Sequence, residues 1–282
     1  MPERPETDFG NLPSTSDWKS GSSGRIVHVH PKKKLGQHFL RWKEVGEKIV
    51  ASLGATQEHT VIEIGAGTGE LTRIILKYAG LVVAVEVDET CFPTLKLLEG
   101  LNKNLQLFFG DIRNLNLSSF QNVLILGNLP YHLSGDILFW LLEQRDFWRK
   151  AILTVQAEFA ERLSAQTGSH DYSALSVVAQ TFLTVRELFE IDPKAFVPQP
   201  KVRSITIEIA PLSSPAWKKD PSSFSKKVRV CFTHRRKTLL NNLRMAKIET
   251  PERIMQSLGL KEKIRPQELS PDDYVKLVDY IS

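Results

Sequence analysis

The stretch TVIEIGAGTGELTRIILKYAGLVVAVE, residues 60–86, decides the fold. It opens and closes on apolar runs of strand length that are rich in β-branched residues. Between them a glycine-rich turn at 65–69 leads into a helical pattern over 70–79. Two buried strands joined by a crossover helix form a parallel βαβ unit, so this stretch predicts an α/β protein.

The same alternation of apolar runs and helical patterns continues beyond residue 86. It predicts further strands at 105–109, 123–126 and 151–155, and helices at 89–98, 134–143, 157–166 and 175–182. We expect the segments 186–191 and 202–209 to complete the sheet as an antiparallel pair of strands. The predicted fold class is α/β, with a mostly parallel sheet covered by helices on both faces.

Shifts in composition mark two boundaries. Residues 1–24 are rich in Pro, Ser, Gly and Thr without periodicity, which is typical of a disordered tail. After Ser213–Pro215 the pattern predicts only short helices, at 222–232, 236–246, 250–258 and 270–281, with N-caps at Ser222, Thr250 and Ser270. We therefore expect an α/β domain over 25–213 and a small all-helical domain over 214–282.

The composition is that of a globular protein from a reducing compartment. Apolar residues make up 41% of the 282 residues and charged residues 24%, which argues against a wholly disordered chain. Two cysteines, Cys91 and Cys231, cannot build a disulfide framework or a cysteine-based zinc site. No run approaches the ~18 apolar residues that span a bilayer, and the first residues lack the apolar centre of a signal peptide. We expect a cytoplasmic protein without a membrane partner.

Positive charge is concentrated in two segments. Residues 25–48 hold seven basic side chains against two acidic ones, and residues 218–247 hold ten against Asp220 alone. The formal net charge of the whole chain is only +5, so the remainder is acidic. Two basic segments around an acidic middle favour a polyanionic partner, because phosphate neutralisation with counterion release drives nucleic-acid binding. RNA or DNA is the predicted class of partner, and a solvated charged face is the alternative.

The glycine turn at 65–69 is suited to close approach of a nucleoside. Gly65 and Gly67 allow a sharp turn from strand to helix, and Glu86, at the end of the next strand, can accept hydrogen bonds from ribose hydroxyls. The dinucleotide pattern needs a third glycine at position 70, but Glu70 stands there and its carboxylate would repel a pyrophosphate. The pattern favours S-adenosylmethionine, with Asp111 accepting from the adenine amine.

The segment Asn128-Leu129-Pro130-Tyr131 follows the fourth parallel strand, and we expect it beside the glycine turn. An adenine N6 amine is a poor nucleophile because its lone pair is delocalised into the ring. Hydrogen bonds from its two N–H groups to the Asn128 side-chain oxygen and the Leu129 carbonyl would favour a pyramidal nitrogen. Tyr131 offers a ring on which a flipped base can stack. The segment predicts methyl transfer by positioning, without a metal, and an ordinary strand-ending turn is the alternative.

These motifs resemble those of the small-subunit ribosomal RNA adenine N6,N6-dimethyltransferases. The resemblance extends over about residues 30–282 and rests also on KKKLGQHFL at 32–40, FVPQPKVRS at 196–204 and RRKTLLNNL at 235–243. It implies a Rossmann-like S-adenosylmethionine-dependent methyltransferase domain with a small C-terminal all-helical domain. It further implies two adjacent adenosines in a hairpin near the rRNA 3′ end as acceptors, an immature 30S subunit as partner, and a monomeric enzyme of ribosome biogenesis.

The resemblance also assigns roles to residues. It implies a cofactor pocket formed by His38, Leu40, Gly65, Gly67, Glu86, Asp111, Ile112 and Asn128. It implies a catalytic set in which two aromatic rings sandwich the flipped base, made of Asn128, Leu129, Pro130, Tyr131 and Phe196. The implied RNA contacts are basic side chains in three places, namely Lys32, Lys33, Lys34, Lys201, Arg235, Arg236 and Lys237. No metal ligand is implied.

Two positions depart from the family pattern. The residues after Tyr131 read His-Leu-Ser-Gly-Asp, where the family usually ends this turn in Ser/Thr-Pro, and position 157 is Ala where a basic residue is common. Two alternative functions stay open. One is the antibiotic-resistance dimethylase of large-subunit rRNA, which normally has Ile at the position of Leu129. The other is a non-catalytic RNA-binding factor, which would not need Glu86 and Asn128.

Overall fold

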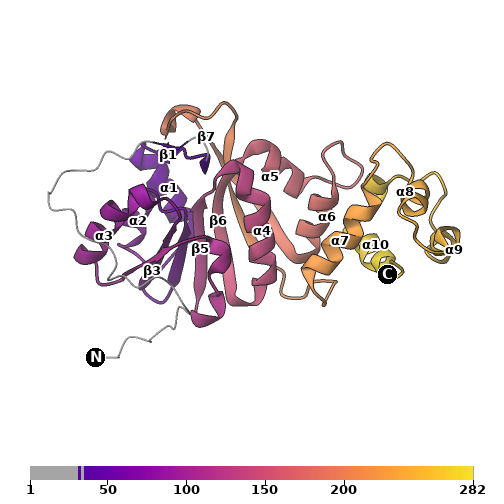
Figure 1. The fold of residues 1–282 in the computed structure, drawn as a ribbon, viewed down its shortest axis with the longest axis horizontal. Helices are drawn as coiled ribbons and strands as arrows, with labels where there is room; N and C mark the ends of the chain where they lie inside the picture. The colour runs from indigo at the N-terminus through magenta and orange to yellow at the C-terminus, as the bar shows by residue number, and fades with distance from the viewer. Residues whose placement is uncertain (1–30, 33–34, 282) are drawn as a thin grey trace.

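A computed structural model describes residues 31–32 and 35–281, and the tail predicted at 1–24 lies outside them. Its centre is a seven-stranded sheet with the strand order β4-β3-β2-β5-β6-β9-β7 (Figure 1). Five strands are parallel: β2 (Thr60–Ile64), β3 (Leu81–Glu86), β4 (Leu105–Phe109), β5 (Val123–Asn128) and β6 (Trp148–Gln156). The last two, β7 (Leu183–Ile191) and β9 (Ser204–Pro211), complete the sheet as the predicted antiparallel pair.

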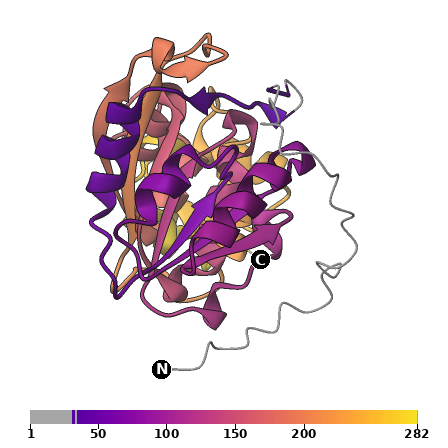
Figure 2. The same cartoon turned by 90° about the vertical axis from the view of Figure 1, so that its left-hand side faces the viewer.

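Helices cover both faces of the sheet, as the continuous apolar strands predict. One face packs against α1 (Lys43–Leu53), α2 (Glu70–Ile75) and α3 (Phe92–Leu101), whose indigo and purple ribbons face the viewer in Figure 2. The other face packs against α4 (Ser134–Glu143), α5 (Ala157–Ser164) and α6 (Ala174–Phe182). Strand β2 divides its side chains between the two layers: Val61 belongs to the first apolar cluster, and Ile62 and Ile64 belong to the second.

The chain after β9 forms the four short helices that the pattern predicts: α7 (Pro221–Cys231), α8 (Leu239–Met245), α9 (Pro251–Ser257) and α10 (Pro271–Val278). They extend the molecule at one end of the sheet (Figure 1). Their apolar side chains join the core beneath α4–α6; the Phe224 ring, for example, meets the Phe182 ring edge-on at 5.6 Å. The helical region therefore shares one continuous core with the sheet region, and the division at residue 214 stays a prediction.

Two further strands form a separate small sheet, in which β1 (Phe39–Leu40) pairs antiparallel with β8 (Phe196–Val197). Short 3-10 turns connect the larger elements, at Glu89–Cys91, Ile112–Asn114, Leu117–Ser119, Tyr131–Leu133, Arg145–Phe147, Pro193–Ala195 and Pro266–Glu268. The β1–β8 pair ties the segment before α1 to the loop before β9.

Three local predictions are wrong. Helix α2 ends at Ile75 rather than Ala79, because the backbone hydrogen bonds tighten after it, with Tyr78 N donating to the Ile75 carbonyl. Asp220, not Ser222, caps α7, since its carboxylate accepts from two backbone N–H groups of the first turn. Thr250 precedes α9 in a left-handed conformation, and its side chain makes no capping bond. The Ser270 cap is confirmed by its bond from the Asp273 N–H.

Candidate active site

The strand order reverses direction between β2 and β5, which creates a switch point at the carboxyl ends of the strands. A pocket lies at this point. It is lined by residues that follow or end four parallel strands, among them Gly65, Gly67, Glu86, Asp111, Ile112, Asn128, Leu129, Pro130 and Tyr131. His38 lines the pocket as well, so the structure brings together ten of the predicted site residues from five separate places in the sequence.

The glycine turn is shaped by backbone conformations that other residues rarely adopt. Gly65 and Gly67 have φ values of 74° and 56°. A Cβ at Gly67 would also lie 3.0 Å from the ring of Phe39, which lines the same pocket. The missing side chain therefore allows the described residues before α1, 31–32 and 35–42, to lie close to the turn; these residues are called the N-terminal segment below.

Glu86 is the carboxylate at the end of β3, and the backbone around it holds it in place. Its Oε2 accepts from Gly67 N at 2.7 Å, and its Oε1 accepts from Val87 N and Asp88 N at 2.9 and 2.8 Å. Burial raises the pKa of Glu86, against the lowering effect of these donors. The carboxylate is fixed, and Oε2 keeps one lone pair for a ligand hydroxyl.

Asp111 lines the pocket but is already paired. Its two carboxylate oxygens accept from the guanidinium of Arg113, at distances down to 2.6 Å, and Oδ1 also accepts from Arg113 N. These contacts lower the pKa of Asp111. A second carboxylate, Asp136 at the start of α4, lies 3.3 Å from the same guanidinium. An adenine amine can therefore donate to Asp111 only if Arg113 gives up one of its hydrogen bonds to this carboxylate.

Asn128 ends β5, and its side chain is oriented by the N-terminal segment. Its Nδ2 donates to the His38 carbonyl at 2.8 Å, and hydrogen bonds between described residues leave its Oδ1 unused. The His38 ring is fixed in turn, since its Nδ1 lies 2.7 Å from the Pro198 carbonyl, to which it must donate. The Asn128 Nδ2 atom is therefore anchored, and Oδ1 can accept a hydrogen bond from a substrate.

Tyr131 is held by a hydrogen bond at its hydroxyl and by stacking on its ring. Its hydroxyl lies 2.5 Å from Ser204 Oγ, and burial raises its pKa. The His38 ring stacks on it, with ring centroids 5.4 Å apart and an interplanar angle of 25°. One side of the tyrosine ring therefore already has an aromatic neighbour.

Two predicted site residues are not exposed in the pocket. Phe196 is only 1% exposed, because the pairing of β1 with β8 covers it, and it lies in the apolar cluster beneath α1 and α2. The expected sandwich of a base between Tyr131 and Phe196 is therefore not formed in this conformation. Leu40 is buried in the same cluster, so a cofactor contact from Leu40 would have to come from its backbone.

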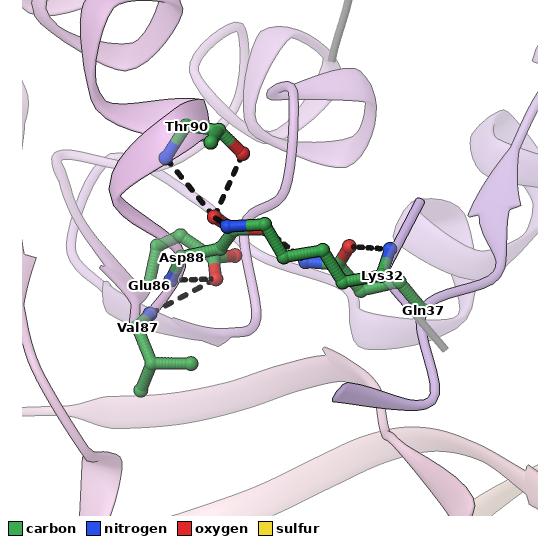
Figure 3. A network of polar contacts seen from close by, with 6 residues as sticks. All are labelled: Lys32, Gln37, Glu86, Val87, Asp88 and Thr90. Atoms are coloured by element: carbon green, nitrogen blue, oxygen red, sulfur yellow. Dashed lines mark hydrogen bonds and ion pairs between the residues drawn. The ribbon is translucent and has the colours of Figure 1, made fainter. Parts of the chain in front are cut away.

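A network of polar contacts fastens the N-terminal segment to the loop after β3 (Figure 3). The Asp88 carboxylate accepts from Lys32 Nζ at 2.6 Å and from Gln37 Nε2 at 2.8 Å. Burial of Asp88 disfavours its charge, but these bonds and those from Thr90 prevail and lower its pKa to about 2. The charge of Lys32, an expected RNA contact, is thus engaged within the chain. Lys33 and Lys34 lie outside the described residues.

The remaining predicted RNA contacts do not line this pocket. Lys201, Arg236 and Lys237 are exposed and Arg235 is partly buried, and the ion pairs among residues 31–32 and 35–281 include none of them.

The described residues contain no group of three or more His, Cys, Asp or Glu side chains that could hold a metal ion. They also form no helix long and apolar enough to cross a bilayer.

Sequence reasoning missed several residues of the pocket wall. Leu35, Gln37 and Phe39 line it from the N-terminal segment, and Arg113 lines it from the turn after β4. Leu35, Gln37 and Phe39 belong to the KKKLGQHFL motif, which assigns no role to them, and the signal for Arg113 was its closeness to Asp111. Contacts between segments far apart in the chain decide their positions, and no local pattern reports such contacts.

Solved structures with the same fold identify the class of protein as a Rossmann-like methyltransferase. A dimethyladenosine transferase from Plasmodium falciparum superposes with a TM-score of 0.75 at 26% identity, covering 85% of this chain and 96% of that one. The 23S rRNA methyltransferase ErmE shares the fold, with a TM-score of 0.65 at 22% identity over 86% of this chain and 99% of its own.

The sequence comparisons define the family. The profile described as ribosomal RNA adenine dimethylase matches residues 29–282, and the chain belongs to this family of methyltransferases. A relative from Lactobacillus delbrueckii, named ribosomal RNA small subunit methyltransferase A, is 33% identical over 96% of this chain and 97% of its own length. One of the same name from Chlorobium chlorochromatii is 39% identical over 77% of this chain and 83% of its own.

Proposed function

We propose that this chain transfers methyl groups from S-adenosylmethionine to N6 of two adjacent adenosines in a hairpin near the 3′ end of small-subunit rRNA. The product is N6,N6-dimethyladenosine, made during ribosome biogenesis. Membership in the adenine dimethylase family supports the chemistry, and the names of the bacterial relatives support the small subunit as the source of the RNA.

The observation that carries the proposal is the anchored amide of Asn128. Because Nδ2 donates to the His38 carbonyl, Oδ1 is the part of this amide that can accept from a substrate amine. The Leu129 carbonyl follows directly in the chain and provides the second acceptor. Two acceptors fixed before the substrate arrives favour the pyramidal amine of the transition state, and no reorganisation is needed when it forms.

The residues of the pocket fit S-adenosylmethionine, which supplies an electrophilic methyl group on a sulfonium. Glu86 would hold the ribose through the open lone pair on Oε2, and Asp111 and Ile112 would hold the adenine. The wall carries three carboxylates against one guanidinium, which is itself bound to two of them. Such a wall attracts a cationic ligand and repels a pyrophosphate.

The RNA would be held outside this pocket, by Lys201 and by the Arg235–Lys237 cluster, as a phosphate backbone is held by unpaired cations. We further propose that the enzyme acts as a cytoplasmic monomer on an immature 30S subunit. The proposed RNA contacts rest on the exposed basic side chains, and the cytoplasmic location, the monomer and the 30S partner rest on the resemblance to the family.

The test is incubation of the purified chain with cofactor labelled in its methyl group and either naked rRNA or immature small subunits. The label is then mapped by nuclease digestion and nucleoside analysis. We expect N6,N6-dimethyladenosine at two adjacent positions of the 3′ hairpin. Label confined to large-subunit RNA, or no transfer to any RNA, would contradict the proposal.

A further inference from the structure

A second cavity, of about 530 Å³, lies between α4, α5, α6 and α7. In the fold α4 contacts α7, α7 contacts α6, and α6 contacts α5. The cavity is distinct from the cofactor pocket, but the two share a wall: Asp136, in the first turn of α4, lines both. A Cβ added to the neighbouring Gly135 would meet no atom within 4 Å. The ridge between the two cavities, formed here by Gly135 and Asp136, is therefore uncrowded at Gly135.

The charge of this groove suits a polyanion. Arg162 from α5, Arg229 from α7 and Arg235 from the turn after α7 all line it. The ion pairs found within the described part of the chain use none of these three guanidinium groups. Asp136 is the only carboxylate in the wall, and it lies against Arg113 on the other side of the ridge. The groove thus holds three cations to which no carboxylate of residues 31–32 or 35–281 is paired.

The apolar part of the groove contains three phenyl rings beside Ala174 and Leu175. Phe139, Phe159 and Phe232 line it, and each is only partly buried. The Arg229 guanidinium lies 5.3 Å from the Phe139 ring centroid, and Phe232 is fixed by stacking on Tyr274 at 5.6 Å. Unpaired guanidinium groups beside rigid aromatic rings provide both contacts that an unpaired nucleotide needs, one for its phosphate and one for its base.

We propose that this groove binds a nucleotide next to the target adenosine on the same RNA strand. Its base lies against Phe159 and Phe232 and its phosphate on Arg162 and Arg229, while the target base crosses the ridge at Gly135 into the cofactor pocket. The groove fixes the register of the strand, so that one chosen adenosine reaches Asn128. The inference rests on the proposed function, because it takes the substrate to be RNA.

The test compares variants of the groove on an RNA hairpin substrate. Replacing a guanidinium that binds phosphate, in Arg162→Gln or Arg229→Gln, should raise the Kd for the hairpin about tenfold, with cofactor affinity retained. In a second arm, single abasic nucleotides are placed at each position flanking the target. One position should weaken binding to the wild-type chain, and the same abasic site should add nothing in Phe159→Leu, because the stacking surface is already reduced.

Arg149→Gln is the matched control, since it removes one positive charge at the amino end of β6, far from the carboxyl ends where the pocket lies. Its Kd should equal that of the wild type at the same ionic strength. The inference is overturned if both groove arginine variants bind the hairpin as the control does, or if abasic and Phe159→Leu effects add at every position. Binding is measured separately from methyl transfer. A wild-type chain that binds the hairpin without methylating it would contradict the proposed function, and the binding data would still test the groove.

Discussion

At the scale of single residues, Glu86 shows how the chain prepares a ligand site. Three backbone N–H groups hold its carboxylate, and one lone pair of Oε2 remains for a ribose hydroxyl. Glu86→Ala should weaken cofactor binding by ~1.5–3 kcal/mol, the usual worth of a hydrogen bond to a charged group. Isothermal calorimetry with S-adenosylmethionine measures this directly. Unchanged affinity would move the ribose site elsewhere.

Glu63, in β2 beneath the glycine turn, makes stability depend on pH. Burial raises its pKa to about 8, although Thr72 donates to it at 2.6 Å. The unfolded chain releases this proton near pH 4.5 and the folded chain near pH 8, so the folded state binds more protons in between. The contribution of protonated Glu63 to the free energy of unfolding is fully present below pH 4.5 and is lost as pH rises through about 8.

We therefore expect the wild-type chain to lose ~2–5 kcal/mol of unfolding free energy between pH 5 and 8 relative to Glu63→Gln, whose amide does not titrate. Urea unfolding at several pH values measures the difference. Glu58→Gln, at an exposed position, should follow the wild type. Parallel curves for wild type and Glu63→Gln would show that Glu63 is not protonated in the fold.

The parts of the site that the sequence predicts are those fixed by strand ends. Gly65, Gly67, Glu86 and Asn128 each follow or end a recognisable apolar run, and the parallel topology brings strand ends together. The bond from Asn128 to the His38 carbonyl and the ion pair of Asp88 were not predictable in this way. Such contacts join segments whose relative placement depends on the whole fold.

At the scale of elements, the parallel strands were predicted because they are short, apolar and bounded by turns. Helix α1 was missed, since Trp42 before it has no capping oxygen and Gly46 interrupts its apolar face. The structure explains that glycine: a Cβ there would lie 3.0 Å from Ile74 of α2, so Gly46 allows the two helices to pack closely. The β1–β8 pair is equally invisible to local patterns, because each strand has only two residues.

The N-terminal segment is the element on which the pocket most depends. Asp88→Asn removes the partner of Lys32, so residues 35–39, which form one wall of the pocket, should loosen. We expect faster amide hydrogen exchange in this segment and cofactor binding weaker by ~1 kcal/mol. Glu89→Gln, at the exposed neighbouring position, serves as the control. Equal exchange in both variants would show that the network does not hold the segment.

At the scale of the whole molecule, the apolar cluster beneath α4–α6 joins the sheet, which carries the proposed cofactor pocket, to the C-terminal helices, which carry much of the basic surface. The ion pairs among the described residues use none of Arg235, Arg236 and Lys237. Reversing all three to Glu should weaken RNA binding steeply, because the new carboxylates repel phosphate. Each lost phosphate contact should reduce the salt slope by ~0.7 to 0.9. Titrations of labelled rRNA at several salt concentrations measure both quantities.

Cofactor affinity should survive this triple reversal, because the cofactor pocket is lined by other residues. A variant with unaltered RNA affinity and salt slope would show that the cluster is a solvated face. The RNA would then have to be held by other basic residues, among them Lys201, Arg162 and Arg229.

The central claim is that the Asn128 amide activates an adenine amine for methyl transfer. Single-turnover transfer to the rRNA hairpin, with nucleoside products identified by mass spectrometry, tests it most directly in the wild type and in Asn128→Ala. We expect the wild type to form N6,N6-dimethyladenosine. The rate in the variant should be at least ~100-fold lower, because the lost hydrogen bond acts in the transition state. The variant should retain its affinity for RNA. A variant that folds, binds the hairpin and forms the dimethylated product at nearly the wild-type rate would contradict it.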